Sequence, residues 1–147
     1  MISVEDTITV EASPEALFAY VSEPTNQPEI TPSITDVEVV ETYPDGATKA
    51  TYTYDMVGVS LTGETEQVAY EPGERIVSEL SGDISAELTW AFDAIDGGTE
   101  VRYAAEYDLP GAALERAVRP LVERYNERML VTTLANLKTR VEATATS

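Results

Sequence analysis

Apolar and polar residues alternate along most of the first 109 residues, and this period of two is typical of β-strands with one buried face. A first strand is expected over Ile2 to Glu11, and the alternation resumes at Ile34. From there, turn residues such as Pro44-Asp45-Gly46 and Asp96-Gly97-Gly98 divide the chain into six consecutive strands. Strands that follow one another through short turns predict an antiparallel meander.

Helical patterns flank this meander on both sides. Ser13 is placed to cap a short helix that begins at Pro14 and ends before Pro24, and a further helical turn is expected over Thr25 to Ile30. After Pro110-Gly111, apolar residues recur at helical spacing to the end of the chain. Pro120 interrupts that pattern, so the long helix either kinks or restarts there. The residues of its expected apolar face are Leu114, Val118, Leu121, Val122, Tyr125, Met129, Thr133, Leu137 and Val141.

Three segments, read together with this order of elements, resemble a known superfamily. They are the strand and helix start over 7–18, the proline-containing stretch over 28–34 and the closing helix over 134–142. All three are similar to the START-like (SRPBCC) superfamily, and most of all to its polyketide cyclase/dehydrase-like branch. The resemblance spans essentially the whole chain and implies one domain over residues 1–147. It also implies an α+β helix-grip fold, in which a curved antiparallel sheet wraps around the long C-terminal helix and leaves an internal cavity.

Two absences from the composition narrow the chemistry. The chain has no cysteine and no histidine, which excludes disulfides, thiolate nucleophiles, imidazole-based triads and the usual zinc ligands. No cofactor and no metal are therefore expected. No apolar run approaches the roughly 20 residues of a membrane-spanning helix, and the first residues lack the features of a signal peptide. We expect a cytoplasmic protein.

The net charge of −18 is dispersed along the chain, and only Lys49 and Lys138 are lysines. Dispersed carboxylates with few lysines favour a halophilic origin, where molar salt screens self-repulsion. Residues 110–147 carry six bases and four acids, a net charge of +2, so the first 109 residues carry −20. Because those arginines alternate with glutamates at helical intervals, intrahelical ion pairs are expected rather than a nucleic-acid partner. The expected state is a monomer or weak dimer.

The inward faces of the strands, together with one face of the long helix, supply the candidate ligand-binding residues. Aromatic walls suit a flat or apolar ligand, and tyrosine hydroxyls can fix its orientation. The candidates are Tyr52, Tyr54, Met56, Leu61, Leu88, Trp90, Phe92, Tyr103, Tyr107, Tyr125 and Met129. The alternative is that these side chains simply pack as core.

The charged side chains of the strands fall on the opposite face. These are Asp55, Glu64, Glu66, Glu87, Asp93, Arg102 and Glu106. The inward face offers mainly tyrosines with Thr65, Gln67 and Ser78 as polar groups, so no catalytic residue is assigned.

Three functions remain open at this stage. The favoured one is binding or transport of a hydrophobic small molecule that is lipid, isoprenoid or polyketide-like, and it predicts an enclosed cavity of several hundred Å³, as is typical of ligand pockets. A polyketide cyclase/dehydrase-type enzyme predicts a charged or strongly perturbed group inside that cavity. A ligand-free interaction module predicts a filled interior and an exposed complementary patch.

Overall fold

The computed structural model describes the backbone over residues 2–56, 59–108 and 112–145, without the side chains of residues 56, 59, 112–119, 122, 144 and 145. The elements follow the expected order, with a short 3-10 turn between the two N-terminal helices. They are β1 (Ile2–Val10), α1 (Pro14–Ser22), η1 (Pro24–Asn26), α2 (Gln27–Ile30), β2 (Ile34–Thr42), β3 (Thr48–Met56), β4 (Val59–Glu71), β5 (Arg75–Gly82), β6 (Ser85–Ile95), β7 (Gly98–Asp108) and α3 (Ala112–Ala145).

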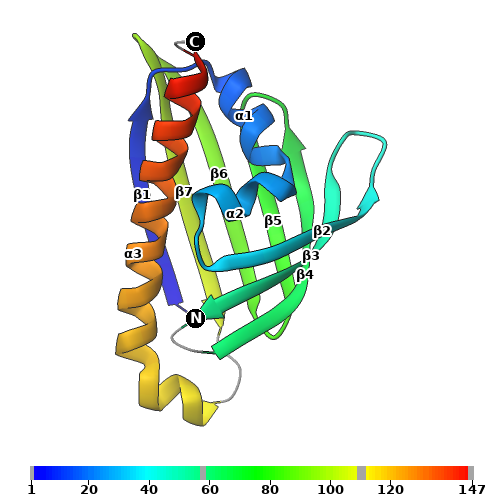
Figure 1. Ribbon diagram of the computed structural model, residues 1–147, viewed down its shortest axis with the longest axis vertical. Helices are drawn as coiled ribbons and strands as arrows, with labels where there is room; N and C mark the ends of the chain where they lie inside the picture. The colour runs from blue at the N-terminus through cyan, green and yellow to red at the C-terminus, as the bar shows by residue number, and fades with distance from the viewer. Residues whose placement is uncertain (1, 57–58, 109–111, 146–147) are drawn as a thin grey trace.

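The seven strands form one antiparallel sheet in the order β1-β7-β6-β5-β4-β3-β2. The predicted meander is confirmed, since β2 to β7 pair in sequence and β1 closes the sheet against β7. The sheet curves around the space beneath the helices, with α3 lying over β1 and β7, and α1 and α2 over one end (Figure 1). This arrangement is the expected helix-grip fold.

The curvature has a local cause at Gly63 of β4 and Gly82 of β5, which are direct partners. A Cβ added at Gly63 would lie 2.0 Å from the Ser81 carbonyl oxygen and 2.9 Å from the Tyr52 hydroxyl. Gly82 has a φ of 102°, which disfavours other residues. The bare backbone at this pair therefore allows two strands to approach at the bend, and β-bulges in β2 and β4 bend those strands further.

The helices largely follow their predicted signals. The Ser13 side chain accepts a hydrogen bond from the backbone N–H of Ala16 at 3.1 Å and so caps α1, as expected. Pro120 lies inside α3, which is one continuous helix bent near this end rather than two helices (Figure 1). The bend is explained by the missing N–H and the ring of the proline.

The predicted apolar face of α3 is wrong at Leu121, whose exposed fraction is 52%. The buried face runs through Leu130, Leu134, Leu137 and Val141. Spacings of three and four residues extend this series back to residues 126 and 122 rather than to 121. The predicted positions Leu114, Val118 and Val122 lie outside the described side chains.

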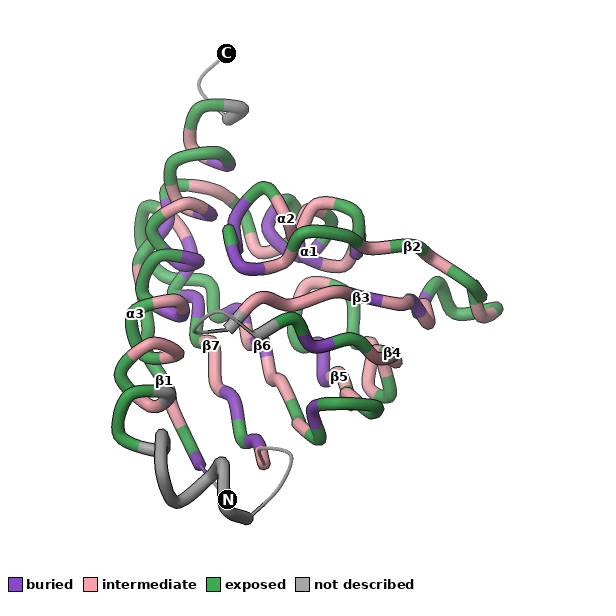
Figure 2. Tube along the Cα trace, turned by 60° about the horizontal axis from the view of Figure 1, so that its bottom comes forward, coloured by how far each residue is buried: buried purple, intermediate pink, exposed green. Residues whose placement is uncertain are grey.

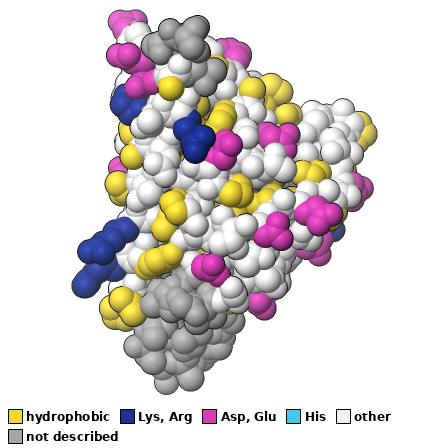
Figure 3. All heavy atoms as spheres, viewed as in Figure 1, with side chains coloured by type: hydrophobic (Ala, Val, Ile, Leu, Met, Phe, Trp, Pro, Cys, Tyr) yellow, Lys and Arg dark blue, Asp and Glu magenta, His cyan; other side chains and the backbone are white. Residues whose placement is uncertain are grey.

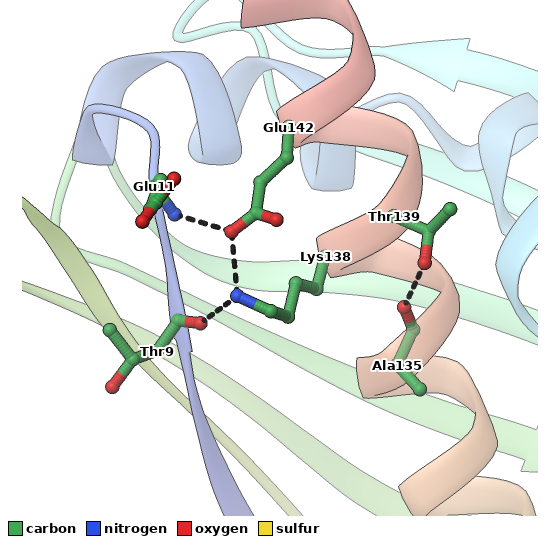
Figure 4. Close-up of polar contacts among 6 residues, drawn as sticks. All are labelled: Thr9, Glu11, Ala135, Lys138, Thr139 and Glu142. Atoms are coloured by element: carbon green, nitrogen blue, oxygen red, sulfur yellow. Dashed lines mark hydrogen bonds and ion pairs between the residues drawn. The ribbon is translucent and has the colours of Figure 1, made fainter.

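Polar contacts anchor the C-terminal end of α3 to the end of β1 (Figure 4). The Lys138 ammonium donates to the Thr9 carbonyl oxygen at 2.9 Å and to the Glu142 carboxylate at 2.6 Å. The same carboxylate accepts from the backbone N–H of Glu11 at 2.8 Å. Both interactions lower the pKa of Glu142, the ion pair with Lys138 more than the backbone N–H. This end of the helix is thus fixed to the sheet.

Burial and charge are distributed as the sequence suggested. Buried residues recur along α1, α3 and the strands, with exposed residues between them (Figure 2). Acidic side chains are dispersed over the face shown in Figure 3, and most basic side chains there lie over α3. The carboxylates form no single acidic block on that face.

Candidate functional site

A cavity of about 160 Å³ lies between the sheet and α3, and residues of α1, η1 and α2 also line it. Its walls come from every strand and from all three α-helices, and the lining side chains are apolar or neutral polar. They are Val4, Val21, Pro24, Gln27, Thr31, Ile34, Val37, Thr48, Tyr52, Tyr54, Thr65, Gln67, Ile76, Ser78, Leu80, Ile84, Ala86, Leu88, Trp90, Tyr103, Ala105, Tyr107, Asn126, Met129, Leu130 and Thr133.

The structure brings seven of the predicted ligand-binding residues together around this cavity: Tyr52, Tyr54, Leu88, Trp90, Tyr103, Tyr107 and Met129. Three others lie elsewhere. Phe92 belongs to the packed core beneath α1, and Leu61 packs in a second core cluster. Tyr125 packs against that second cluster. Met56 ends β3, and its side chain lies outside the described residues. Alternation therefore predicted the face of the strands that borders the cavity, while position along each strand decides which residues line it. Trp90 and Tyr52 line the cavity and also pack in the core clusters.

One wall carries an aromatic stack. Trp90 and Tyr103 are direct cross-strand partners on β6 and β7, and their rings are parallel, with centroids 3.9 Å apart. The Phe92 ring is parallel to Trp90 at 6.5 Å, and Phe18 of α1 meets Phe92 edge-on at 6.2 Å. Such contacts add about 0.5–1.5 kcal/mol each beyond burial. The stack continues from the core into the cavity and holds the Tyr103 ring in place.

A hydrogen-bonded bridge crosses the cavity between two strands through α3. The Tyr54 hydroxyl donates to Asn126 Oδ1 at 2.7 Å, and Asn126 Nδ2 donates to the Tyr107 hydroxyl at 2.8 Å. The pKa of Tyr54 is raised far above its usual value. Burial is the largest cause, and the neighbouring Tyr125, Tyr103 and Tyr107 add to it. Tyr54 therefore stays protonated and acts as a donor at neutral pH.

Tyr125 ties α3 to the start of β2. Its hydroxyl is hydrogen-bonded to the Ser33 hydroxyl and also donates to the Asp55 carbonyl oxygen at 3.0 Å. The backbone N–H of Asp55 donates in turn to the Ser33 carbonyl oxygen at 2.8 Å. The hydroxyl of Tyr125 thus serves to hold elements together rather than to face the cavity.

Two tyrosine hydroxyls lack this kind of support. Within the described part of the chain, the Tyr52 hydroxyl is buried without a hydrogen-bond partner, and its pKa is raised to about 12 by burial and by the Asp83 carboxylate. Burial alone raises the pKa of Tyr103, and no described residue donates to or accepts from its hydroxyl. Both remain neutral over the physiological range.

The polar residues of the lining were partly predictable. Thr65, Gln67 and Ser78 line the cavity as expected from alternation. Gln67 is occupied structurally, since it accepts from the backbone N–H of Thr48 at 2.9 Å and donates to the Ser22 carbonyl oxygen at 3.0 Å.

Asn126 and the buried Thr31–Thr133 hydroxyl pair, 2.8 Å apart, were missed as site residues. The signal for Asn126 was its position four residues before Leu130, on the buried face of α3.

The strand carboxylates and Arg102 lie outside the cavity lining, as predicted. Glu66 accepts from the Tyr43 hydroxyl at 2.5 Å, and Arg102 pairs with Glu5 at 2.5 Å on the exposed side of the sheet. Among the described residues, no group of three or more acidic side chains is arranged to hold a metal ion. Nor is any helix in the described residues long and apolar enough to cross a membrane.

Comparison with known proteins assigns the chain to a protein family. The family model for polyketide cyclase/dehydrase and lipid transport matches residues 1–142. The chain belongs to this family. Among curated proteins, no sequence match was found.

Solved structures agree with the family in fold. Protein TTHA0849 of Thermus thermophilus superposes with a TM-score of 0.86 at 20% identity, over 97% of this chain and 99% of that one. The Zhui aromatase/cyclase of Streptomyces sp. R1128 gives 0.83 at 18% identity, over 96% and 93%. A START superfamily protein of Mycobacterium smegmatis gives 0.78 at 21% identity, over 96% and 97%. At these identities the likeness establishes the helix-grip fold of the family and no particular activity.

Proposed function

We propose that this member of the polyketide cyclase/dehydrase and lipid transport family binds or carries a hydrophobic small molecule, lipid, isoprenoid or polyketide-like in character, in the cavity between the sheet and α3. The observation that carries the proposal is the cavity itself, which lies between the sheet and α3 and is lined mainly with apolar and aromatic side chains. Burying an apolar ligand there removes its surface from water at roughly 25 cal/mol per Å².

The size of the cavity constrains the ligand. Its volume of about 160 Å³ is smaller than the several hundred Å³ expected from the sequence. Large side chains, among them Trp90 and Tyr103, and the bridging Asn126 line this space. A comparable apolar cavity of about 150 Å³ accommodates benzene. A ligand of one aromatic ring fits the cavity as it stands, and a larger one requires the walls to move apart.

The chemistry of the lining supports binding over catalysis. A cyclase or dehydratase moves protons at the substrate, which requires a general base close to it. The described lining contains no carboxylate, and burial raises the pKa values of Tyr52, Tyr54 and Tyr103, which keeps these three protonated. Cyclase/dehydrase activity remains the alternative function, because the family description includes it and a protonated tyrosine can act as an acid. The interaction-module function is disfavoured, because it predicts a filled interior.

The test is a substitution that enlarges one lining side chain so that it fills part of the cavity. Ala105 of β7 is buried and lines the cavity, whereas its neighbour Ala104 points to the opposite face of the sheet. In the Ala105→Leu variant the added side chain occupies the cavity and should abolish ligand uptake while the protein stays folded. Ala104→Leu makes the same chemical change on the other face and should bind as the wild type does.

Uptake is measured in two ways. Native mass spectrometry of gently purified protein detects an apolar molecule that co-purifies. Fluorescence of Trp90, the single tryptophan and a cavity residue, reports titration with neutral aromatic probes. Loss of the bound mass and of the Trp90 response in Ala105→Leu alone supports binding in this cavity. Equal uptake by Ala105→Leu and the wild type places the ligand elsewhere, and no uptake by any folded variant removes the binding function.

A further inference from the structure

The lining of the cavity discriminates by charge. The polar groups of its described lining side chains are hydroxyls, amides and the Trp90 indole N–H, with no Asp, Glu, Lys or Arg. An ionised carboxylate or ammonium transferred into this space would lose its hydration without gaining an opposite charge, which is strongly unfavourable. The net charge of −18 on the surrounding protein adds repulsion for an anion. The ligand that this cavity suits is therefore uncharged.

Four tyrosine hydroxyls form a cluster beside the cavity. Tyr54, Tyr103 and Tyr107 line the cavity, and Tyr125 lies outside the lining. Their hydroxyls are close enough that the other three each act electrostatically on Tyr54. Tyr54 and Tyr107 are bound to Asn126, and Tyr125 is bound to Ser33 and to the Asp55 backbone. Within this cluster, Tyr103 is the member whose hydroxyl has no hydrogen-bond partner among the described residues.

The other unpartnered hydroxyl, that of Tyr52, is a poorer candidate for a ligand contact. It is fully sealed by packing and lies against Gly63 at the bend of the sheet. The Tyr103 hydroxyl is not sealed in this way, and its ring is fixed by the stack on Trp90. A rigid ring that presents a donor to an apolar space loses little conformational entropy when it binds an acceptor. Tyr103 is thus the hydroxyl that a ligand can reach.

We propose that the cavity selects uncharged small molecules that carry a hydrogen-bond-accepting oxygen, such as a ketone, and that the Tyr103 hydroxyl donates to that oxygen. The inference rests on the proposed function, since it names the ligand chemistry of the same cavity. Tyr103 acts here as a specificity-determining residue. Apolar ligands of similar shape make the same contacts with the cavity walls, and the Tyr103 hydroxyl raises the affinity of those that carry an acceptor oxygen.

Three probes of nearly equal shape and size isolate each part of this inference. Acetophenone is neutral and carries an acceptor oxygen, α-methylstyrene replaces that oxygen with a methylene group, and benzoate replaces the methyl ketone with a carboxylate. Dissociation constants are measured by ligand-observed NMR titration. The wild type should bind acetophenone about fivefold to tenfold more tightly than α-methylstyrene, as one net hydrogen bond gives. Benzoate should bind at least about tenfold more weakly than α-methylstyrene.

The variants are Tyr103→Phe and, as control, Tyr43→Phe. Phenylalanine keeps the stack on Trp90 and removes the hydroxyl, so the two neutral probes should bind Tyr103→Phe equally while α-methylstyrene is held as in the wild type. The Tyr43 hydroxyl donates to Glu66 and lies outside the cavity lining, so its removal should preserve the preference for acetophenone. Thermal unfolding of each variant establishes that the fold is intact.

The outcomes distinguish a failure of this inference from a failure of the proposed binding function. If both neutral probes bind the wild type equally, or if the preference survives in Tyr103→Phe, the assigned role of Tyr103 is wrong and the binding cavity stands. Benzoate binding as tightly as acetophenone overturns the selection for uncharged ligands. If neither neutral probe binds the folded wild type, the inference and the proposed binding function are both overturned.

Discussion

Tyr54 of β3 and Tyr107 of β7 are hydrogen-bonded to the same side chain, Asn126 of α3, although three strands lie between them in the sheet. In a flat sheet, strands four places apart are separated by roughly 19 Å. The curvature of the sheet turns both tyrosines toward α3, where one amide serves as acceptor for the first and donor for the second. The bridge couples the two walls of the cavity to the helix.

Replacing Asn126 should therefore destabilise the fold more than a typical surface change does. Asn126→Leu keeps the approximate size but removes the acceptor for Tyr54 and a donor to Tyr107, with an expected loss of about 1–3 kcal/mol in the free energy of unfolding. Urea denaturation measures the loss. Asn136→Leu is the matched control on the same helix, because the Asn136 amide donates one hydrogen bond, to the Ile30 carbonyl oxygen. A loss at Asn136 that equals or exceeds that at Asn126 would show that the bridge adds no stability.

The bend of the sheet should tolerate no side chain at Gly63. A methyl group there would meet the Ser81 carbonyl oxygen at 2.0 Å, and a backbone atom in a paired strand cannot move aside cheaply. Gly63→Ala should cost about 3 kcal/mol or more, at the upper end of overpacking effects. Gly97→Ala is the control that introduces backbone strain without a steric clash. Gly97 has a φ of 84°, and no atom lies within 4 Å of an added Cβ. That control should cost about 1–2 kcal/mol. The measurement is the melting temperature of each variant. If Gly63→Ala and Gly97→Ala lower it equally, the close contact between Gly63 and the Ser81 carbonyl oxygen does not affect stability.

The Tyr52 hydroxyl should make the protein sensitive to alkaline pH. Its pKa is about 12 in the folded chain against 10 when unperturbed, so above pH 10 the unfolded chain loses this proton first. The free energy of unfolding should then fall as pH rises from 10 to 12. Tyr52→Phe lacks this contribution, and it also removes a buried hydroxyl without a described partner, so it should be at least as stable as the wild type at pH 7.

The difference between the two proteins is the decisive measurement. Denaturation curves at pH 7, 10 and 12 should show the advantage of Tyr52→Phe growing across the alkaline range. The other tyrosines are present in both proteins and cancel in this difference. A constant difference over that range would mean that the Tyr52 hydroxyl ionises as readily in the folded chain as in the unfolded one.

Salt should stabilise this protein, as the halophile hypothesis predicts. Two electrostatic effects oppose each other. The exposed ion pairs, such as Arg102 with Glu5 and Arg75 with Glu71, add little stability and weaken in salt. The repulsion among carboxylates that gives a net charge of −18 also weakens, and with 27 acidic against nine basic residues it dominates. The melting temperature should rise steadily from low salt to molar KCl. A melting temperature that is flat or falls would contradict the halophilic interpretation and leave the ion pairs as the larger effect.

The sequence by itself determined the elements, their order and which face of each strand turns inward. The period of two placed Tyr52, Tyr54, Trp90 and Tyr103 on inward faces, because successive side chains of a strand point to opposite sides whatever the rest of the fold does. Turn residues fixed where the strands end, and Ser13 with Pro14 fixed the start of α1, because these signals act over a few residues.

Only the tertiary structure decided which inward residues border a cavity and which pack as core. Phe92 lies two residues from Trp90 on the same face, yet α1 covers Phe92 and the space beneath α3 borders Trp90. Asn126 looked like one more polar residue of an amphipathic helix until the curved sheet brought Tyr54 and Tyr107 to it. Local periodicity fixes the direction of a side chain, whereas cavities and bridges depend on where distant elements meet. In this protein, the bend at Gly63 and Gly82 and the packing of α3 against β1 bring those elements together.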